Sequence, residues 1–199
     1  MLEIIETILG GGVVVYPTET LYAVGCDATN PAAARRVVEI KAREGMKPLP
    51  ILVGSMHMLE MVAVEVSDEV IRLAELFWPG PLSILVQSLE TLAPAVRDEH
   101  GFTSVRWTPH PLATRLCREV GAPLVCTSAN FSGQPPAATP TALNPALLDL
   151  VDESLLDRPW PAGGDPSTLV RPLEDGSVQI LRPGAVSVQL LESKGFKVG

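Results

Sequence analysis

The distribution of apolar and polar residues predicts helices and strands in alternation along the chain. Apolar residues recur at helical spacing in six segments: 2–9, 31–40, 55–62, 67–77, 110–120 and about 145–151. Short runs that are almost wholly apolar predict buried strands over 13–16, 49–53, 82–86 and 123–126. Alternating segments predict further strands over 103–107, 166–170 and 177–181. Because this mixture carries no internal repeat, it predicts a single α/β domain over residues 1–199, with a core of about 10–185.

Polar residues at segment ends predict where several helices begin and where loops follow strands. Asn30 is expected to cap the helix that starts at Pro31, and Ser67 to cap the next long helix. The strand over 13–16 is followed by Pro17-Thr18-Glu19-Thr20, which is predicted to be a loop that continues to about Ala28, with a tight bend at Gly25.

Composition and charge narrow the class of protein. The chain has 199 residues with 46% hydrophobic and 19% charged residues, which is typical of a packed domain rather than a disordered chain. No apolar run reaches the roughly 20 residues that span a bilayer, and the first residues lack the basic start of a signal peptide, so a cytosolic location is expected. A net charge of −8 disfavours a protein that coats nucleic acid, although it leaves room for a local basic cleft.

The three cysteines give no sign of a metal or redox site. Cys26, Cys117 and Cys126 have neither CxxC nor zinc-finger spacing, so they are expected to be buried free thiols. No metal-binding residues are predicted.

A group of cations stands where the 31–40 helix gives way to an extended run. Lys41, Arg43 and Lys47 would face the negative end of the helix dipole, which is ordinary chemistry for a helix C-terminus. The following strand is too apolar to hold these charges in solvent, which favours a second interpretation in which they rim a concave anion site. Both interpretations stay open from the residues alone.

Other polar residues follow strands, where α/β proteins place ligand contacts. The Thr18 to Thr20 loop either caps a helix or contacts a small polar ligand, and Arg106 is either a surface ion-pair residue or a clamp for a carboxylate. Ser128 and Asn130 either form a turn or contact a ligand. Ser128 lacks the GxSxG setting of a hydrolase nucleophile, and no GxxxxGK[ST] string is present, so neither a hydrolase triad nor a P-loop is predicted. His110 is interpreted as a local hydrogen-bonding residue.

Taken together, several blocks of sequence resemble the YrdC/Sua5 family, and they occur in family order between about residues 10 and 185. The blocks are Tyr16-Pro17-Thr18-Glu19-Thr20 with 21–25, Lys41-Ala42-Arg43, Trp78-Pro79-Gly80-Pro81-Leu82, Val105-Arg106, 128–133, Pro166-Ser167-Thr168 and Leu181-Arg182-Pro183-Gly184.

This resemblance implies a fold and a reaction. The fold would be an open, twisted mixed parallel and antiparallel sheet flanked by helices, with a concave basic cleft. The reaction would make threonylcarbamoyl-adenylate and pyrophosphate from L-threonine, bicarbonate and ATP, with Mg²⁺ accompanying ATP. The product would pass to a tRNA threonylcarbamoyl-transferase complex that modifies adenosine 37 of tRNAs reading ANN codons, with direct tRNA contact as an open alternative.

The resemblance also assigns roles to residues of this chain. Lys41 and Arg43 would be catalytic and hold the ATP phosphates, and L-threonine would lie against Thr20, Arg106 and Thr168. The remaining ATP contacts would come from Lys47, Ser128, Asn130 and Arg182.

Three positions depart from the family pattern. Glu44 stands where many members have proline, Leu52 where longer members have a histidine that touches threonine, and Phe102 where a small hydroxyl residue is frequent. Two other functions remain alternatives: an RNA-binding module that uses the same cleft without chemistry, and a carbamoyl-transferring domain like those of hydrogenase-maturation enzymes. The scarcity of aromatic residues, at 5%, weighs against base stacking on RNA.

Overall fold

A computed structural model describes residues 1–41 and 47–199 of the chain. The predicted phosphate contact Arg43 and the departure at Glu44 lie outside the described residues.

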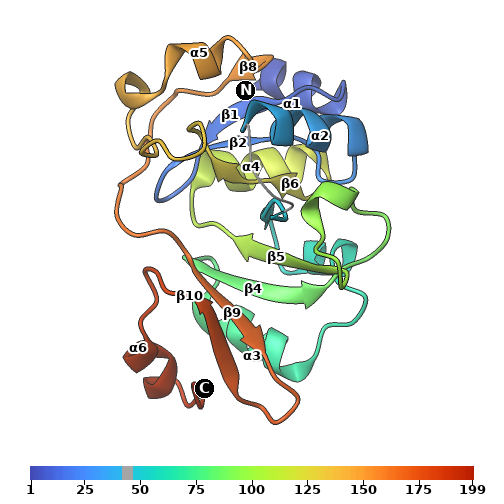
Figure 1. Cartoon of the computed structure of the whole chain (residues 1–199), viewed down its shortest axis with the longest axis vertical. Coiled ribbons are helices and arrows are strands. Elements are labelled where there is room, and N and C mark those ends of the chain that lie inside the picture. Colours follow the sequence, from blue (N-terminus) through green and yellow to red (C-terminus); the bar gives the residue numbers. More distant parts are fainter. Residues whose placement is uncertain (42–46) are drawn as a thin grey trace.

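The strands form two mixed sheets, each with parallel and antiparallel neighbours (Figure 1). The four-stranded sheet has the order β7-β2-β1-β8. Its strands are β1 (Val14–Pro17), β2 (Tyr22–Gly25), β7 (Thr127–Ser128) and β8 (Glu153–Ser154). The six-stranded sheet has the order β10-β9-β4-β5-β3-β6. Its strands are β3 (Ile51–Val53), β4 (Leu82–Gln87), β5 (Phe102–Trp107), β6 (Leu124–Val125), β9 (Thr168–Pro172) and β10 (Val178–Arg182).

The helices lie around these sheets (Figure 1). They are α1 (Leu2–Leu9), α2 (Pro31–Ile40), α3 (Asp68–Phe77), α4 (Pro111–Val120), α5 (Pro145–Leu148) and α6 (Val188–Ser193). Short 3₁₀ turns occupy His57–Met61, Pro94–Val96 and Pro140–Ala142. Helix α4 contacts β1 of one sheet and β3 of the other, so it ties the two sheets together. The prediction of an α/β domain with mixed strands flanked by helices is confirmed, with the strands divided between two sheets.

The helix starts follow from local chemistry that the sequence displays. The Asn30 side chain accepts hydrogen bonds from the Ala32 and Ala33 N–H groups at 3.0 and 3.1 Å, and Pro31 needs no such partner because it has no N–H. Ser67 accepts from Val70 N–H in the same way at 3.4 Å. Both predicted caps are confirmed. Helix α4 ends at Gly121, whose φ of 73° lies in the left-handed region that glycine tolerates.

The predicted loop over 17–28 was wrong in its second half, because Tyr22–Gly25 is strand β2 and pairs antiparallel with β1. All four of its residues are buried, so they lack the period-two alternation that identifies a half-exposed strand. Gly25 does not mark a bend. A Cβ there would lie 1.8 Å from Val125 O, so glycine is required for the close approach of β2 to the chain beside it.

Strands β7 and β8 and helix α6 were not predicted either. Strand β8 has only two residues, and helix α6 has six, which is too short for a clear periodic pattern. Arg72 holds the end of α6 by donating to Lys194 O at 2.9 Å and by lying 4.4 Å from the Phe196 ring centroid.

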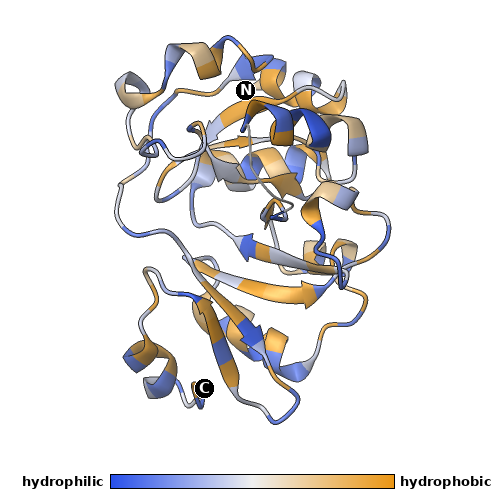
Figure 2. Cartoon of the chain, in the orientation of Figure 1, coloured by the Kyte–Doolittle hydropathy of each residue, from blue (hydrophilic) through white to orange (hydrophobic). Residues whose placement is uncertain are grey.

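The core is built from the apolar strands and the inward faces of the helices, as the hydropathy colouring of Figure 2 shows. Cys26 and Cys117 belong to this core and Cys126 is half-buried, and all three are free thiols, as predicted. Burial raises the pKa of Cys26 to about 12 and also raises the pKa values of the other two. Within the described part of the chain, no helix has the length and apolarity needed to cross a bilayer.

Candidate functional site

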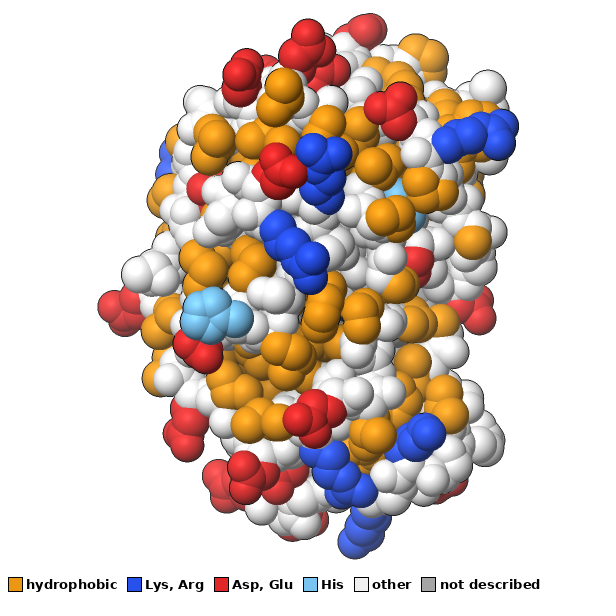
Figure 3. Space-filling model, turned by 180° about the vertical axis from the view of Figure 1, so that it is seen from behind, with side chains coloured by type: hydrophobic (Ala, Val, Ile, Leu, Met, Phe, Trp, Pro, Cys, Tyr) orange, Lys and Arg blue, Asp and Glu red, His pale blue; other side chains and the backbone are white. Residues whose placement is uncertain are grey.

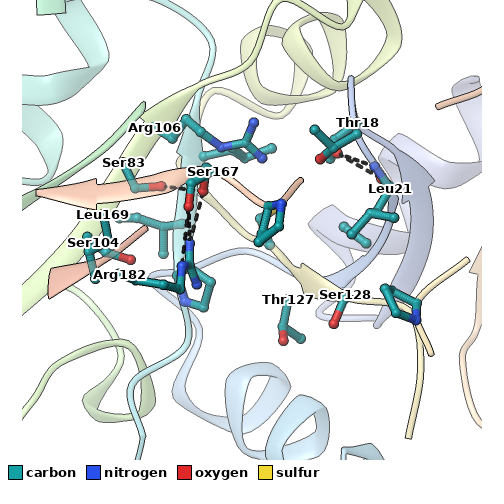
Figure 4. A pocket seen from close by; sticks show the side chains of 18 of the residues that line it. Thr18, Leu21, Ser83, Ser104, Arg106, Thr127, Ser128, Ser167, Leu169 and Arg182 are labelled. Atoms are coloured by element: carbon teal, nitrogen blue, oxygen red, sulfur yellow. Dashed lines mark hydrogen bonds between the residues drawn. The ribbon is translucent and has the colours of Figure 1, made fainter. Parts of the chain in front are cut away.

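A pocket of about 460 Å³ lies between the two sheets, and its size falls in the range of small-molecule sites (Figure 4). One side of its wall comes from the β1–β2 loop, β2 and β7, and the other from β3, β4, β5, β9 and β10. Of the predicted site residues, the structure brings five to this wall: Thr20, Lys47, Arg106, Ser128 and Arg182.

The β1–β2 loop is fixed by its own hydrogen bonds. Thr18 N–H donates to Leu21 O at 3.0 Å, and the Thr18 hydroxyl donates to the same oxygen at 2.7 Å. Gly163 N–H donates to Thr20 O at 3.0 Å, which ties the loop to the segment that leads into β9. These bonds hold Thr20 in place at the pocket wall, and none of them uses the Thr20 hydroxyl.

Arg106 reaches the pocket from β5 and has a carboxylate partner within the chain. Its Nη1 donates to Glu19 Oε1, and 8% of the Arg106 side chain and 16% of the Glu19 side chain are exposed. The Thr108 hydroxyl donates to the other carboxylate oxygen of Glu19. Arg106 is therefore an ion-pair residue, but the pair is largely buried rather than on the surface as one interpretation had it.

A row of hydroxyls and one arginine lies on the six-stranded side of the pocket (Figure 4). Arg182 Nη2 donates to Ser167 O at 2.8 Å and to Ser167 Oγ at 3.0 Å. Ser167 Oγ is in turn 2.9 Å from Ser83 Oγ. The arginine predicted to contact phosphate is thus held at the pocket wall by a serine that the sequence analysis did not single out.

Lys41, the predicted catalytic residue, is buried and is not among the residues that line this pocket. Its ammonium donates to Ser128 O, to Asn130 O and, at 3.1 Å, to Asn130 Oδ1. In this structure Lys41 therefore supports the Ser128 to Asn130 loop.

Asn130 follows Ser128 but lines a second hollow of about 280 Å³ rather than the inter-sheet pocket. Its amide donates to Phe131 O at 3.0 Å and to Gln134 O at 2.6 Å. Its side chain thus shapes the loop that presents Ser128.

Thr168 does not close the pocket, and that expectation was wrong. Its hydroxyl donates to Val186 O at 2.7 Å and accepts from Val186 N–H at 2.9 Å, and the residue is fully buried. Strand alternation explains the error, because Ser167 and Leu169 on either side face the pocket and Thr168 must point the other way.

His110 is a hydrogen-bonding residue, as interpreted, but the partner of its side chain is distant in the sequence rather than local. Its Nε2 lies 3.0 Å from Pro159 O, and burial lowers the pKa of the imidazole.

The sequence analysis missed the hydroxyls of Ser83 and Ser104 and the carboxylate of Glu19 as parts of the site. Ser83 and Ser104 lie in strands β4 and β5, where a polar residue in an otherwise buried run was the available signal. Among the described residues, no group of three side chains is arranged to bind a metal ion. On the face seen in Figure 3, acidic and basic side chains are interspersed rather than gathered into one charged surface.

Comparisons with known proteins agree on one family. A family model for Sua5, YciO and YrdC proteins, described as "Telomere recombination", matches residues 6–184. A threonylcarbamoyl-AMP synthase of Xanthomonas euvesicatoria is 37% identical over 180 residues, which are 89% of this chain and 94% of that protein. A putative threonylcarbamoyl-AMP synthase of Mycobacterium tuberculosis is 34% identical over 95% of this chain and 86% of its own length.

A solved structure of Sua5 from P. abyssi in complex with L-threonine superposes with a TM-score of 0.90 at 28% identity. The match covers 99% of this chain but only 58% of the P. abyssi chain. This chain therefore spans less than two thirds of that protein's length.

Proposed function

The chain belongs to the Sua5/YciO/YrdC family, and we propose that its inter-sheet pocket makes threonylcarbamoyl-AMP and pyrophosphate from L-threonine, bicarbonate and ATP. The chain is accordingly an enzyme of the nucleotidyltransferase class. One observation carries the proposal: over nearly its whole length the chain is similar to threonylcarbamoyl-AMP synthases, and its inter-sheet pocket joins Thr20, Arg106 and Arg182.

The roles of the pocket residues follow from their chemistry. Arg106 would pair with the threonine carboxylate, because a guanidinium presents several N–H donors that match a carboxylate, and Thr20 would complete this subsite. Arg182 and Lys47, together with Arg43 outside the described residues, would hold the ATP phosphates. The Ser128 hydroxyl would lie beside the nucleotide. Lys41 and Asn130 would act by shaping the loop that carries Ser128.

The reaction needs positioning and charge neutralisation more than covalent catalysis. The amine of threonine and bicarbonate give a carbamate and water, and a carbamate oxygen then attacks the α-phosphorus of ATP while pyrophosphate leaves. Charge builds on the phosphates during this step, where Arg182 and Lys47 line the pocket. Holding both reactants between the two sheets supplies proximity, and no side-chain nucleophile is required.

Mg²⁺ would enter with ATP, because phosphate oxygens are its usual ligands and the donors on this pocket wall are hydroxyls and cations rather than carboxylates. The product adenylate would pass to a transferase complex that modifies adenosine 37 of tRNA, and the activity would then be cytoplasmic.

The proposal is tested by pyrophosphate release from ATP with L-threonine and bicarbonate omitted in turn. Release should require both. Arg182→Ala should slow it about tenfold to a hundredfold, because a charge-assisted hydrogen bond is worth roughly 1.5–3 kcal/mol. Arg115→Ala is the matched control, since Arg115 forms an exposed pair with Glu119 on α4. Release that does not depend on threonine, or RNA binding without any turnover, would contradict the proposal.

A further inference from the structure

Glu19 and Arg106 form a largely buried ion pair at the edge of the inter-sheet pocket. Arg106 lines the pocket and Glu19 does not, although the two side chains are hydrogen-bonded to each other. Figure 4 shows the Arg106 side chain reaching from the six-stranded sheet toward the loop that carries Thr18 and Leu21. The carboxylate therefore holds the arginine from outside the space available to a ligand.

Glu19 is itself held in place on two sides. Its carboxylate accepts the hydroxyl proton of Thr108, a fully buried residue whose Oγ1 also accepts His110 N–H at 3.1 Å. Its main-chain oxygen accepts Ala162 N–H at 3.0 Å. An anchored carboxylate of this kind restricts the guanidinium to one orientation, because each hydrogen bond removes freedom from a long side chain.

We infer that Glu19 is a positioning residue for substrate binding. It fixes the Arg106 guanidinium so that the N–H groups not used by Glu19 meet the carboxylate of the amino-acid substrate. This inference rests on the proposed function, since it assumes that a substrate carboxylate binds at Arg106. It assigns Glu19 no contact with the substrate.

Glu19 could affect substrate binding in two ways: through its negative charge beside Arg106, or by holding the Arg106 side chain in one orientation. A carboxylate beside Arg106 reduces the positive potential that a substrate anion feels, so removal of its charge alone would strengthen anion binding. Loss of positioning would weaken anion binding, because Arg106 would have to be ordered when the substrate binds. The two effects therefore have opposite signs.

The test is the KM for L-threonine and the KM for ATP, measured by pyrophosphate release. Glu19→Ala removes both hydrogen bonds and should raise the KM for L-threonine about tenfold, the size expected for one lost charge-assisted bond. Glu19→Gln keeps an acceptor oxygen and should raise it by less than about threefold. In both variants the KM for ATP should stay within about twofold. Thr108→Val, which removes one support of Glu19, should raise the KM for L-threonine in the same direction by about twofold to threefold.

A second arginine–carboxylate pair supplies the control. Arg36 Nη1 lies 2.7 Å from Asp152 Oδ2, and neither residue lines the pocket. Asp152→Asn, which alters this pair, should leave both KM values unchanged. If Glu19→Ala does not fold, Thr108→Val decides the matter by the same readout.

Three results would overturn the inference. A lower KM for L-threonine in both Glu19 variants would show that Glu19 acts through its charge. A parallel rise in both KM values with a lower Tm would show a purely structural role. A wild-type chain without threonine-dependent release would instead contradict the proposed function, and this failure is distinguishable because it appears before any substitution is made.

Discussion

At the scale of single residues, several polar side chains act by holding other residues of the site in place. Lys41 supports the loop that presents Ser128, and Ser167 holds Arg182. The residue types at these positions were recognisable in the sequence, but the direction of each side chain was not. Thr168 shows this most clearly, because a shift of one position along β9 separates the pocket wall from the interior.

Lys41→Met should lower the free energy of unfolding by at least about 1–3 kcal/mol, because oxygens of Ser128 and Asn130 would lose a charged donor in a buried setting. Urea denaturation measures this directly. Lys197→Met, at an exposed position, is the control and should stay within about 0.5 kcal/mol of the wild type. A Lys41→Met protein as stable as the wild type would mean that the lysine does not support the loop.

His110 predicts a specific pH dependence of stability. Burial lowers the pKa of its imidazole below the ordinary 6.5. Below pH 6.5 the unfolded chain therefore binds a proton more readily than the folded chain, which lowers the stability of the fold. The stabilisation is complete above about pH 6.5 and is lost as the pH falls through and below that value. Replacing the imidazole in His110→Gln should therefore flatten the fall in stability between about pH 6.5 and pH 5.

The exposed histidines supply the control for this effect. His57→Gln and His100→Gln should leave the slope unchanged, since their side chains are 85% and 75% exposed. Asp152 does not interfere, because its hydrogen bond with Arg36 lowers the carboxyl pKa and moves its effect below pH 3.8. An identical slope in wild type and His110→Gln would contradict the assignment.

At the scale of elements, local rules account for the helices better than for the site-bearing strands. The starts of α2 and α3 were predicted from their capping residues. Such a cap can be recognised in the sequence because the capping side chain accepts hydrogen bonds from N–H groups only two or three residues away. Strand β2 was missed, because all four of its residues are buried and its burial depends in part on β7, far away in the chain. The pocket hydroxyls of β4 and β5 were missed for the same reason, since only the sheet shows which face meets the pocket.

Gly25 is the most sensitive position that the fold reveals in β2. Gly25→Ala would place a Cβ against Val125 O and 2.9 Å from Tyr16 Cε1, so β2 would have to move. We expect a loss of at least about 2–3 kcal/mol of stability, as for other overpacked interiors. The midpoint of thermal unfolding measures it, with Gly199→Ala, where no atom lies within 4 Å, as the control. A change of only one or two degrees in Gly25→Ala would show that the strands are not tightly apposed.

At the scale of the whole molecule, the two sheets bring segments far apart in sequence to one pocket. The β1–β2 loop, the end of β5 and the start of β9 meet there, although Thr20, Arg106 and Ser167 are widely separated along the chain. The sequence blocks that resemble the YrdC/Sua5 family predicted that these segments act together. The spacing of apolar residues predicted the helices and strands, but not that these segments meet at one pocket. The resulting pocket, with hydroxyls from both sides and cations from the six-stranded side, is the central element of the proposed synthase.

The measurement that tests this account most directly is mass spectrometry of the product formed from ATP, L-threonine and ¹³C-labelled bicarbonate. The account predicts a threonylcarbamoyl-adenylate that carries the heavy carbon, and its near disappearance in Arg106→Ala. An adenylate without the label, or full product formation by Arg106→Ala, would contradict the claim that this pocket joins the three substrates.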